Sequence, residues 1–378
     1  MTEIHGFADE KFAPVKEAFA ANFENRDEIG ASVAVSVEGE MVLDLWGGYR
    51  DGDRTEFWEE DTIVNVYSTT KTMAAMCMLL LADRGEVDLH APVAKYWPEF
   101  AQNGKDKVQV CHFLSHSAGL AGLDEPITGD DIYDWHRVVD ALARQTPWWE
   151  PGSASGYHAM TQGHLIGEVV RRVTGKTLGT YFREEIAEPL QADFHIGTAP
   201  ENFHRIGELV SEGGTLSGQV GQGDSIAART FRSFMPGPDG SGSAAWRMAE
   251  IPAANGHGNA RSVVRVQSVI ANLGSAFGVN LMTEAGCRRV FEEQTNGRDL
   301  VLGLPLRFGM GYGLNSELVP LGPNPNMAFW AGWGGSLVVV DQDARMCISY
   351  VMNRMATTLV GDLRGFSLLR AAYKSLAS

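Results

Sequence analysis

The sequence predicts a fold of mixed helices and strands in which both ends of the chain build one unit and the middle builds another. Strand-like runs rich in Val, Ile and Leu occur near both ends, at residues 32–37, 41–46, 337–340 and 346–352. A helical and loop-rich stretch, about residues 86–240, separates them. If strands from both ends share one sheet, the sheet unit is discontinuous and the helical part is an insertion.

The first elements follow from the spacing of apolar residues. Residues 9–25 carry Phe12, Val15, Phe19 and Phe23 at steps of three or four, which predicts an amphipathic helix. The runs 32–37 and 41–46 are joined by a short turn that contains glycine, so they predict a pair of strands. After a charged loop at 50–61, a mostly apolar helix is expected from Thr69 to Arg84, where Gly85 ends it.

The later elements are predicted in the same way. A helix at about 163–174 ends at Gly175, and another spans 260–273. Residues 213–244 are rich in Gly, Ser and Pro and predict a long irregular loop. Strands at 337–340 and 346–352 follow, and apolar residues recur at helical spacing through the last twenty positions.

Composition and charge exclude several classes of function. The chain has 378 residues, 44% of them hydrophobic and 21% charged, as in ordinary folded proteins. Its net charge of -16 would repel phosphate groups, which argues against nucleic-acid and membrane partners. The longest apolar run, Met73 to Ala82, has ten residues, whereas a membrane span needs about 20. The first residues lack the features of a signal peptide, so we expect a cytoplasmic protein.

No metal or organic cofactor is expected. The four cysteines are far apart in the sequence, as expected of reduced thiols: Cys77, Cys111, Cys287 and Cys347. The ten histidines include no H-E-x-x-H, and no glycine-rich segment is followed by G-K-[ST]. His112 and His116 are four residues apart but flank apolar residues, which favours core or loop positions.

The pair Ser68 and Lys71 is the first candidate for chemistry. S-x-x-K at the start of a helix puts the hydroxyl and the amine on one side, one turn apart. Ser68 alone would also fit as a helix cap. Lys71 is harder to explain in that way, because a cation in the first turn opposes the helix dipole. If the apolar helix is buried, the pKa of Lys71 falls, and a neutral amine is able to act as a base for the serine.

Two further segments fit a site around this pair. Residues 149–157 read W-E-P-G-S-A-S-G-Y and precede a predicted helix. Residues 329–336 read F-W-A-G-W-G-G-S and lead directly into a predicted strand. Small residues in such a segment allow the backbone to come close to a ligand.

The three segments, in this order, resemble the motifs of the serine β-lactamase and penicillin-binding superfamily, most closely its family VIII carboxylesterases. Residues 114–120 and 259–262 are also similar to segments of that family. The resemblance implies an α+β fold of the β-lactamase type, with an antiparallel sheet flanked by the terminal helices and an inserted helical domain. Residues 1–65 and 255–378 would form the sheet domain, residues 66–254 the helical domain, and the active site would lie between them.

The resemblance also implies roles for single residues. Ser68 matches the nucleophile, Lys71 its base and Tyr157 the catalytic tyrosine. The second motif departs from the Tyr-x-Asn of lactamases, because it reads Tyr157-His158-Ala159. The third motif, Lys-Thr-Gly in lactamases, aligns best with Trp330-Ala331-Gly332, so that the backbone N–H groups of Ser68 and Trp333 form the oxyanion hole. A shifted alignment, Trp333-Gly334-Gly335, would use Ser336 in place of Trp333.

These roles imply hydrolysis of carboxylic esters, with short-chain neutral esters preferred because Trp330 replaces the cation that holds a β-lactam carboxylate. The expected partner is a small-molecule ester. Six residues next to the motifs are expected to bind it: Trp330, Ala331, Gly332, His158, Trp148 and Trp149. The alternatives are a β-lactamase, a peptidase acting on D-amino-acid peptides, and a non-catalytic binding protein of the same fold.

Overall fold

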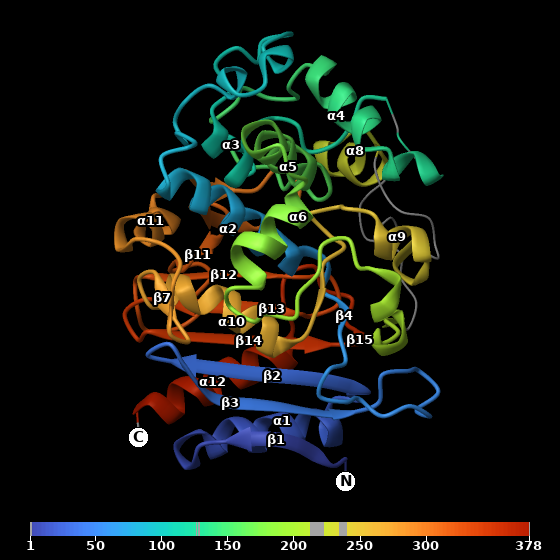
Figure 1. The fold of residues 1–378 in the computed structure, drawn as a ribbon, viewed down its shortest axis with the longest axis vertical. Coiled ribbons are helices and arrows are strands. Elements are labelled where there is room, and N and C mark those ends of the chain that lie inside the picture. Colours follow the sequence, from blue (N-terminus) through green and yellow to red (C-terminus); the bar gives the residue numbers. More distant parts are fainter. Residues whose placement is uncertain (1, 126, 128, 212–222, 234–239, 378) are drawn as a thin grey trace.

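The computed structural model describes residues 2–125, 127, 129–211, 223–233 and 240–377. Its centre is an antiparallel sheet whose nine described strands follow the order β1-β3-β2-β14-β13-β12-β11-β10-β9. Figure 1 shows this sheet in the lower half of the molecule. The bounds of its strands are β1 Ile4–Ala8, β2 Gly30–Val37, β3 Glu40–Gly48, β9 Thr295–Arg298, β10 Pro305–Phe308, β11 Gly313–Leu314, β12 Met327–Ala331, β13 Leu337–Asp341 and β14 Met346–Met352.

The pairing of β2 with β14 joins the two ends of the chain. All seven residues of β14 pair with β2 in antiparallel register, from Met346 opposite Val37 to Met352 opposite Ala31. Residues more than 300 positions apart in the sequence are thus direct neighbours in the sheet. The predicted α+β fold class, with one antiparallel sheet built from both ends, is confirmed.

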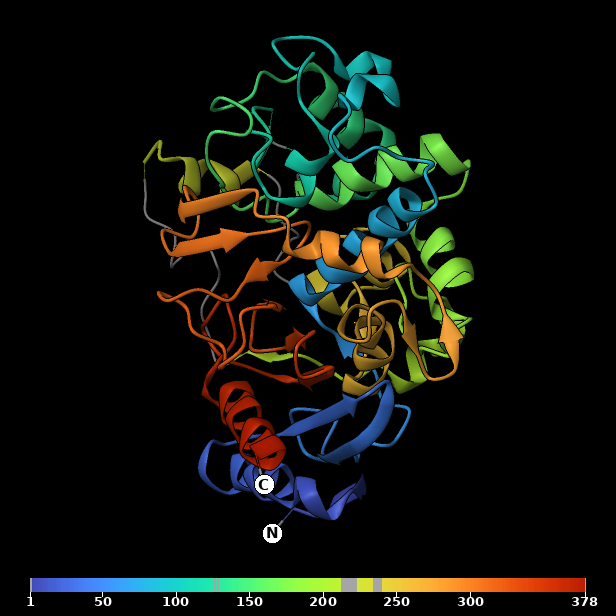
Figure 2. The same ribbon diagram turned by 90° about the vertical axis from the view of Figure 1, so that its left-hand side faces the viewer.

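The terminal helices cover one face of the sheet. Helices α1 (Ala13–Asn25) and α12 (Leu363–Ala377) pack against each other and against this face. Alternate residues of β13 face opposite sides, as the period of a strand requires. Val339 belongs to the core under the terminal helices, whereas Val338 and Val340 belong to the core on the other face. Figure 2 shows both termini at the end of the molecule where these two helices lie.

The opposite face carries α10 and α2. Helix α10 (Ala260–Ala271) packs on β2, β13 and β14. Helix α2 (Thr70–Asp83) lies between the sheet and the helical part, and every residue from Thr70 to Leu81 is buried. This burial explains its nearly continuous apolar sequence, since a helix surrounded by protein needs no polar face.

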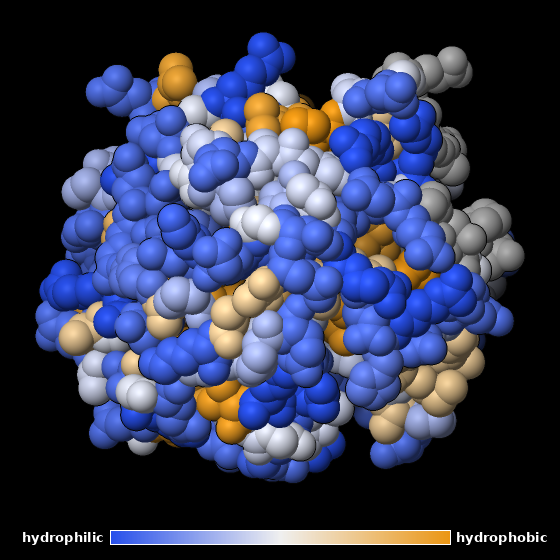
Figure 3. All heavy atoms as spheres, turned by 90° about the horizontal axis from the view of Figure 1, so that it is seen from above, coloured by the Kyte–Doolittle hydropathy of each residue, from blue (hydrophilic) through white to orange (hydrophobic). Residues whose placement is uncertain are grey.

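The helical part lies above the sheet in Figure 1 and includes α3 Val110–Leu114, α4 Trp135–Arg144, α5 Thr161–Thr174, α6 Leu178–Phe182, α8 Ile226–Ser233 and α9 Ala244–Met248. Three small two-stranded sheets and one short helix complete the described strands and α-helices: β4 Val64–Asn65 with β6 His257–Gly258, β5 Val210–Ser211 with β15 Arg354–Met355, β7 Ser275–Ala276 with β8 Val279–Asn280, and α11 Glu284–Arg288. Seen from the helical end, most of the surface is hydrophilic and apolar residues form only small patches (Figure 3).

The proposed domain boundaries at residues 65/66 and 254/255 stay a prediction.

One predicted loop contains a helix. Residues 213–244 were expected to be irregular, but residues 226–233 form α8. Ala228 and Phe231, three positions apart, are buried on its inner side, which the glycines around them obscure in the sequence. Residues 213–222 and 234–239 of the expected loop lie outside the described residues. Among the described helices, none is both long and apolar enough to span a bilayer.

Candidate active site

Ser68 lies in a short 3-10 turn, Tyr67–Thr69, directly before α2. Its side chain does not cap the helix, because Thr69 occupies the N-cap position and no side chain makes a cap hydrogen bond there. Tyr67 adopts a left-handed backbone conformation with φ of 42°, which is uncommon for a residue with a side chain. Such backbone strain is typical of functional sites, and here it immediately precedes Ser68.

Lys71 and Tyr157 both contact the hydroxyl of Ser68. Lys71 Nζ lies 3.1 Å and Tyr157 Oη 2.5 Å from Ser68 Oγ. Lys71 is one turn further along α2, while Tyr157 comes from the segment before α5. The three residues taken from the S-x-x-K and Tyr patterns therefore meet at one point.

Lys71 is buried, with 1% of its surface exposed, and burial lowers its pKa well below the usual range. Its Nζ also lies 2.7 Å from the carbonyl oxygen of Ala159 and 2.8 Å from that of Ala253. Carbonyl oxygens only accept hydrogen bonds, so they take both hydrogens of a neutral amine. The remaining lone pair then faces Ser68, whose O–H is able to donate to it.

Tyr157 is also buried, and burial raises the pKa of its phenol. The side chain therefore stays protonated near neutral pH and donates its hydrogen to Ser68 Oγ. Its backbone N–H donates to the buried carboxylate of Asp299 at 3.0 Å. Lys71 supplies an acceptor for the serine proton, and Tyr157 supplies a donor to the serine oxygen.

The third predicted segment forms the turn between β12 and β13 and packs against the Ser68 turn. Gly332 has no space for a side chain, because a Cβ there would lie 2.1 Å from the carbonyl oxygen of Val66. Ser336 Oγ lies 2.9 Å from both that oxygen and Thr69 Oγ1. Trp330 is buried behind the site, with its ring centroid 5.4 Å from that of Tyr157.

Two N–H groups of this turn have no backbone acceptor among the described residues. The amides of Gly332, Gly334 and Gly335 donate to backbone carbonyls, whereas no such bond is made by Trp333 or Ser336. Trp333 lines the cavity that contains Ser68, and Ser336 does not.

The cavity at Ser68 is small and mostly apolar, with a volume of about 40 Å³. Its described lining contains no Asp, Glu, Lys, Arg or His side chain, so no formal charge faces a bound molecule. The lining residues are Tyr67, Ser68, Tyr157, Ala159, Met160, Phe231, Trp246, Ala254, Trp333 and Leu359.

None of the six residues predicted to bind substrate lines this cavity. Trp330, Ala331 and Gly332 lie in β12 and the turn after it, and the other three side chains make contacts elsewhere. His158 is fully buried, with Nδ1 2.6 Å from the carbonyl oxygen of Gly156 and Nε2 accepting from Leu120 N–H at 3.1 Å. Trp148 lies over Arg229 and donates to Asp124, and Trp149 donates to the carbonyl oxygen of Ala154. Proximity to a motif in the sequence did not reveal which way these side chains point.

Other lining residues were missed by sequence reasoning. Phe231 and Trp246 belong to α8 and α9, in and just after the stretch expected to be an irregular loop, and Leu359 precedes the last helix. None of them stands near a motif, so the sequence gives no signal for them. Tyr67 is next to Ser68, and Met160 is three residues after Tyr157. This closeness to the motif residues is the one feature of the sequence that could have pointed to them.

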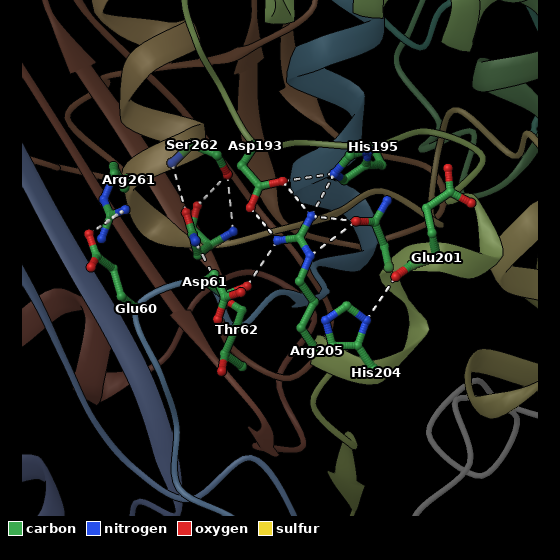
Figure 4. A network of polar contacts seen from close by, with 12 residues as sticks. Glu60, Asp61, Thr62, Asp193, His195, Glu201, His204, Arg205, Arg261 and Ser262 are labelled. Carbon is green, nitrogen blue, oxygen red and sulfur yellow. Dashed lines mark hydrogen bonds and ion pairs between the residues drawn. The ribbon is translucent and has the colours of Figure 1, made fainter.

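A second polar cluster lies beside β4 and β6 (Figure 4). Asp193 contacts His195 at 2.8 Å and is held by the guanidinium of Arg205, which also donates to the carbonyl oxygen of Asp61. Burial acts to raise the pKa of Asp193, but the hydrogen bonds with His195 and Arg205 and the charge of Arg205 together outweigh it, so the pKa is lowered. The cluster links residues 193–205 to the segment that leads to Ser68. Among the described residues, no group of His, Cys, Asp or Glu side chains has the arrangement of a metal site.

The family model for Beta-lactamase matches residues 16–372, almost the whole chain. The protein belongs to the Beta-lactamase family. A curated relative is the esterase/beta-lactamase LipL of Mycobacterium tuberculosis, 35% identical over 377 residues that cover 96% of this chain and 86% of LipL.

Solved structures of this family superpose on nearly the whole chain. A family VIII carboxylesterase is 41% identical with a TM-score of 0.92, and the match covers 99% of this chain and 100% of that one. A penicillin-binding protein homologue from Caulobacter crescentus is 38% identical with a TM-score of 0.90, again covering 99% and 100%.

Proposed function

We propose that this protein is a carboxylesterase that works through an acyl-enzyme on Ser68. The observation that carries the proposal is the position of Ser68 Oγ, 3.1 Å from a buried amine and 2.5 Å from a phenol at the wall of an apolar cavity. The names of LipL and of the family VIII carboxylesterase support ester hydrolysis.

In the acylation step, Ser68 Oγ bonds to the acyl carbon while its proton passes to Lys71 Nζ. The carbonyl π bond opens, and the negative charge on its oxygen is stabilised by the N–H groups of Ser68 and Trp333. Trp333 is preferred to Ser336 because it lines the cavity. An oxyanion donor of this kind is worth about 10²–10³ in rate. When the intermediate collapses, the ester C–O bond breaks and the leaving alkoxide receives a proton from Tyr157, which Lys71 replaces.

Deacylation follows the same route in reverse. A water molecule attacks the acyl carbon, gives its proton to the Lys71–Tyr157 pair, and the Ser68 oxygen leaves with a proton from that pair. Both steps need Lys71 neutral at their start. Burial and the two carbonyl partners favour that state.

The cavity favours small neutral esters. Among the described residues, its lining has no cation to hold a carboxylate, and Trp330 and Ala159 stand where the aligned lactamase motifs have Lys and Asn. Losing a charge-assisted hydrogen bond to a substrate carboxylate costs about 1.5–3 kcal/mol.

The test compares kcat/KM for p-nitrophenyl butyrate with that for nitrocefin and ampicillin. We expect the ester value to exceed both β-lactam values. A higher β-lactam value would replace the esterase assignment by a β-lactamase, the activity that the name of LipL also contains. A fluorophosphonate probe should label the wild type and not Ser68→Ala, and failure to label the wild type would favour a non-catalytic protein.

A cytoplasmic location is proposed as well. All four cysteines are buried and free, as expected in a reducing compartment. Cell fractionation tests this, and recovery in an extracellular or envelope fraction would contradict it.

A further inference from the structure

The backbone around Tyr157 is held by hydrogen bonds from the N–H groups of three consecutive residues, 156 to 158. Gly156 N–H donates to the carbonyl oxygen of His116 at 2.9 Å, and Tyr157 N–H donates to Asp299 Oδ1 at 3.0 Å. His158 N–H donates to Nδ1 of His116, also at 3.0 Å. One residue thus binds the amides on both sides of the tyrosine.

His116 has an unusual conformation that allows this double contact. Its φ is 58°, in the left-handed region, and its side chain is 2% exposed. Because Nδ1 accepts the His158 N–H, the neutral ring carries its hydrogen on Nε2. Burial lowers the pKa of His116 well below its usual range, so the accepting lone pair is retained.

The ring also packs directly on the tyrosine. Its centroid lies 4.9 Å from that of Tyr157 and 5.1 Å from that of Phe308. A small displacement of the 156–158 backbone would move the phenol oxygen away from Ser68 Oγ, which it contacts at 2.5 Å. A misplacement of about 1 Å in an active site is able to cost about 10²-fold in rate.

We propose that His116 is a positioning residue that places the hydroxyl of Tyr157 against Ser68. The inference rests on the proposed role of Tyr157 in ester hydrolysis. His116 does not touch the reacting atoms. It acts through its Nδ1 and its carbonyl oxygen on the backbone of the tyrosine.

Two substitutions separate this role from general packing. In His116→Asn, Oδ1 takes the place of Nδ1, and asparagine tolerates a positive φ. In His116→Gly, the backbone strain is relieved but the acceptor is lost. We expect the Asn variant to keep kcat for p-nitrophenyl butyrate within about threefold of wild type, and the Gly variant to lose about tenfold or more with KM nearly unchanged.

His112→Gly is the matched control. His112 also accepts a backbone N–H through Nδ1, from Gln109 at 3.2 Å, but none of its hydrogen bonds reaches the Tyr157 backbone. Its kcat should stay within about twofold of wild type. Thermal melting of every variant identifies any loss of folded protein.

A double substitution gives the decisive readout. If His116 acts through the Tyr157 hydroxyl, His116→Gly should cause little further loss of kcat in a Tyr157→Phe background. An equal fold-loss in both backgrounds, or a Gly variant with wild-type kcat, would overturn the proposal. If the wild type has no Ser68-dependent esterase activity, the proposed function itself fails, and that result is distinguished by the Ser68→Ala and fluorophosphonate controls.

Discussion

Replacement of Lys71 by arginine, a cation that does not lose its proton, tests its role as a base. Lys71→Arg should lower kcat by about 10³-fold, nearly as much as Lys71→Ala. Arginine stays protonated in proteins and is unable to accept the serine proton, and a general base contributes about 10²–10⁴ in rate. Hydrolysis of p-nitrophenyl butyrate measures the effect, with circular dichroism to check folding. An arginine variant with near wild-type turnover would reduce Lys71 to an electrostatic role.

The pH dependence of catalysis should reflect the same residue. The active form has Lys71 neutral, so kcat/KM should fall as pH decreases through the pKa of this amine. Burial lowers that pKa well below the usual range of lysine, so this loss should begin below the alkaline region where an exposed lysine titrates. A pH profile of kcat/KM measures it. If activity already begins to fall near the usual pKa of lysine as the pH is lowered, burial does not control the pKa of Lys71.

Tyr157 and Ser68 give a further residue-scale test. Tyr157→Phe removes the hydroxyl that lies 2.5 Å from Ser68 Oγ and keeps the ring. We expect kcat to fall about 10²-fold with KM within about threefold, because the lost proton donor acts in the chemical step. Steady-state kinetics on p-nitrophenyl butyrate separate the two constants, and a change confined to KM would assign Tyr157 to binding.

Helices α8 and α9 contribute Phe231 and Trp246 to the cavity, so we expect these two helices to determine which acyl chains the enzyme accepts. Phe231→Ala should raise the ratio of kcat/KM for p-nitrophenyl octanoate to that for the butyrate about tenfold, which corresponds to burial of about two of the four added methylenes at about 0.8 kcal/mol each. Phe231→Leu should change the ratio in the same direction with less effect on stability. Trp148→Ala is the control because Trp148 does not line the cavity, and an equal shift there would contradict the assignment.

The same helices show why sequence patterns predicted some elements and not others. The strands β2, β3, β13 and β14 are mainly apolar runs next to turn residues, a pattern that the sequence shows directly. The S-x-x-K spacing fixed the geometry of Ser68 and Lys71 because one helical turn relates them. Phe231 reaches the cavity only through tertiary packing, and β9 to β11 are too short for a pattern. The orientation of His158 depends on Leu120 and Gly156, which no local rule relates to it.

At the scale of the whole molecule, a buried charge cluster joins both chain ends to the active-site turn. Arg364 of α12 contacts Glu28, which precedes β2, at 2.8 Å, and donates to the carbonyl oxygen of Gly334 at 3.2 Å. Tyr350 of β14 also donates to Glu28. Burial raises the pKa of Glu28 to about 7, although the guanidinium of Arg364 opposes that shift.

Removing one partner of this cluster should destabilise the fold strongly. Arg364→Met removes the cation that Glu28 and Asp362 share. The free energy of unfolding should fall by about 3–5 kcal/mol at a pH above the pKa of Glu28, where its carboxylate is left buried and unpaired, and by less at lower pH, where Glu28 is protonated. Adding Glu28→Gln should restore part of the loss, since a neutral amide needs no counter-charge and is still able to bind Tyr350. Urea denaturation of the single and double variants measures both effects. Because Arg364 also binds the carbonyl oxygen of Gly334, the single variant should lose esterase activity at urea concentrations below its unfolding midpoint, where it is still folded. An Arg364→Met variant with the activity and stability of the wild type would contradict the link between the chain ends and the site.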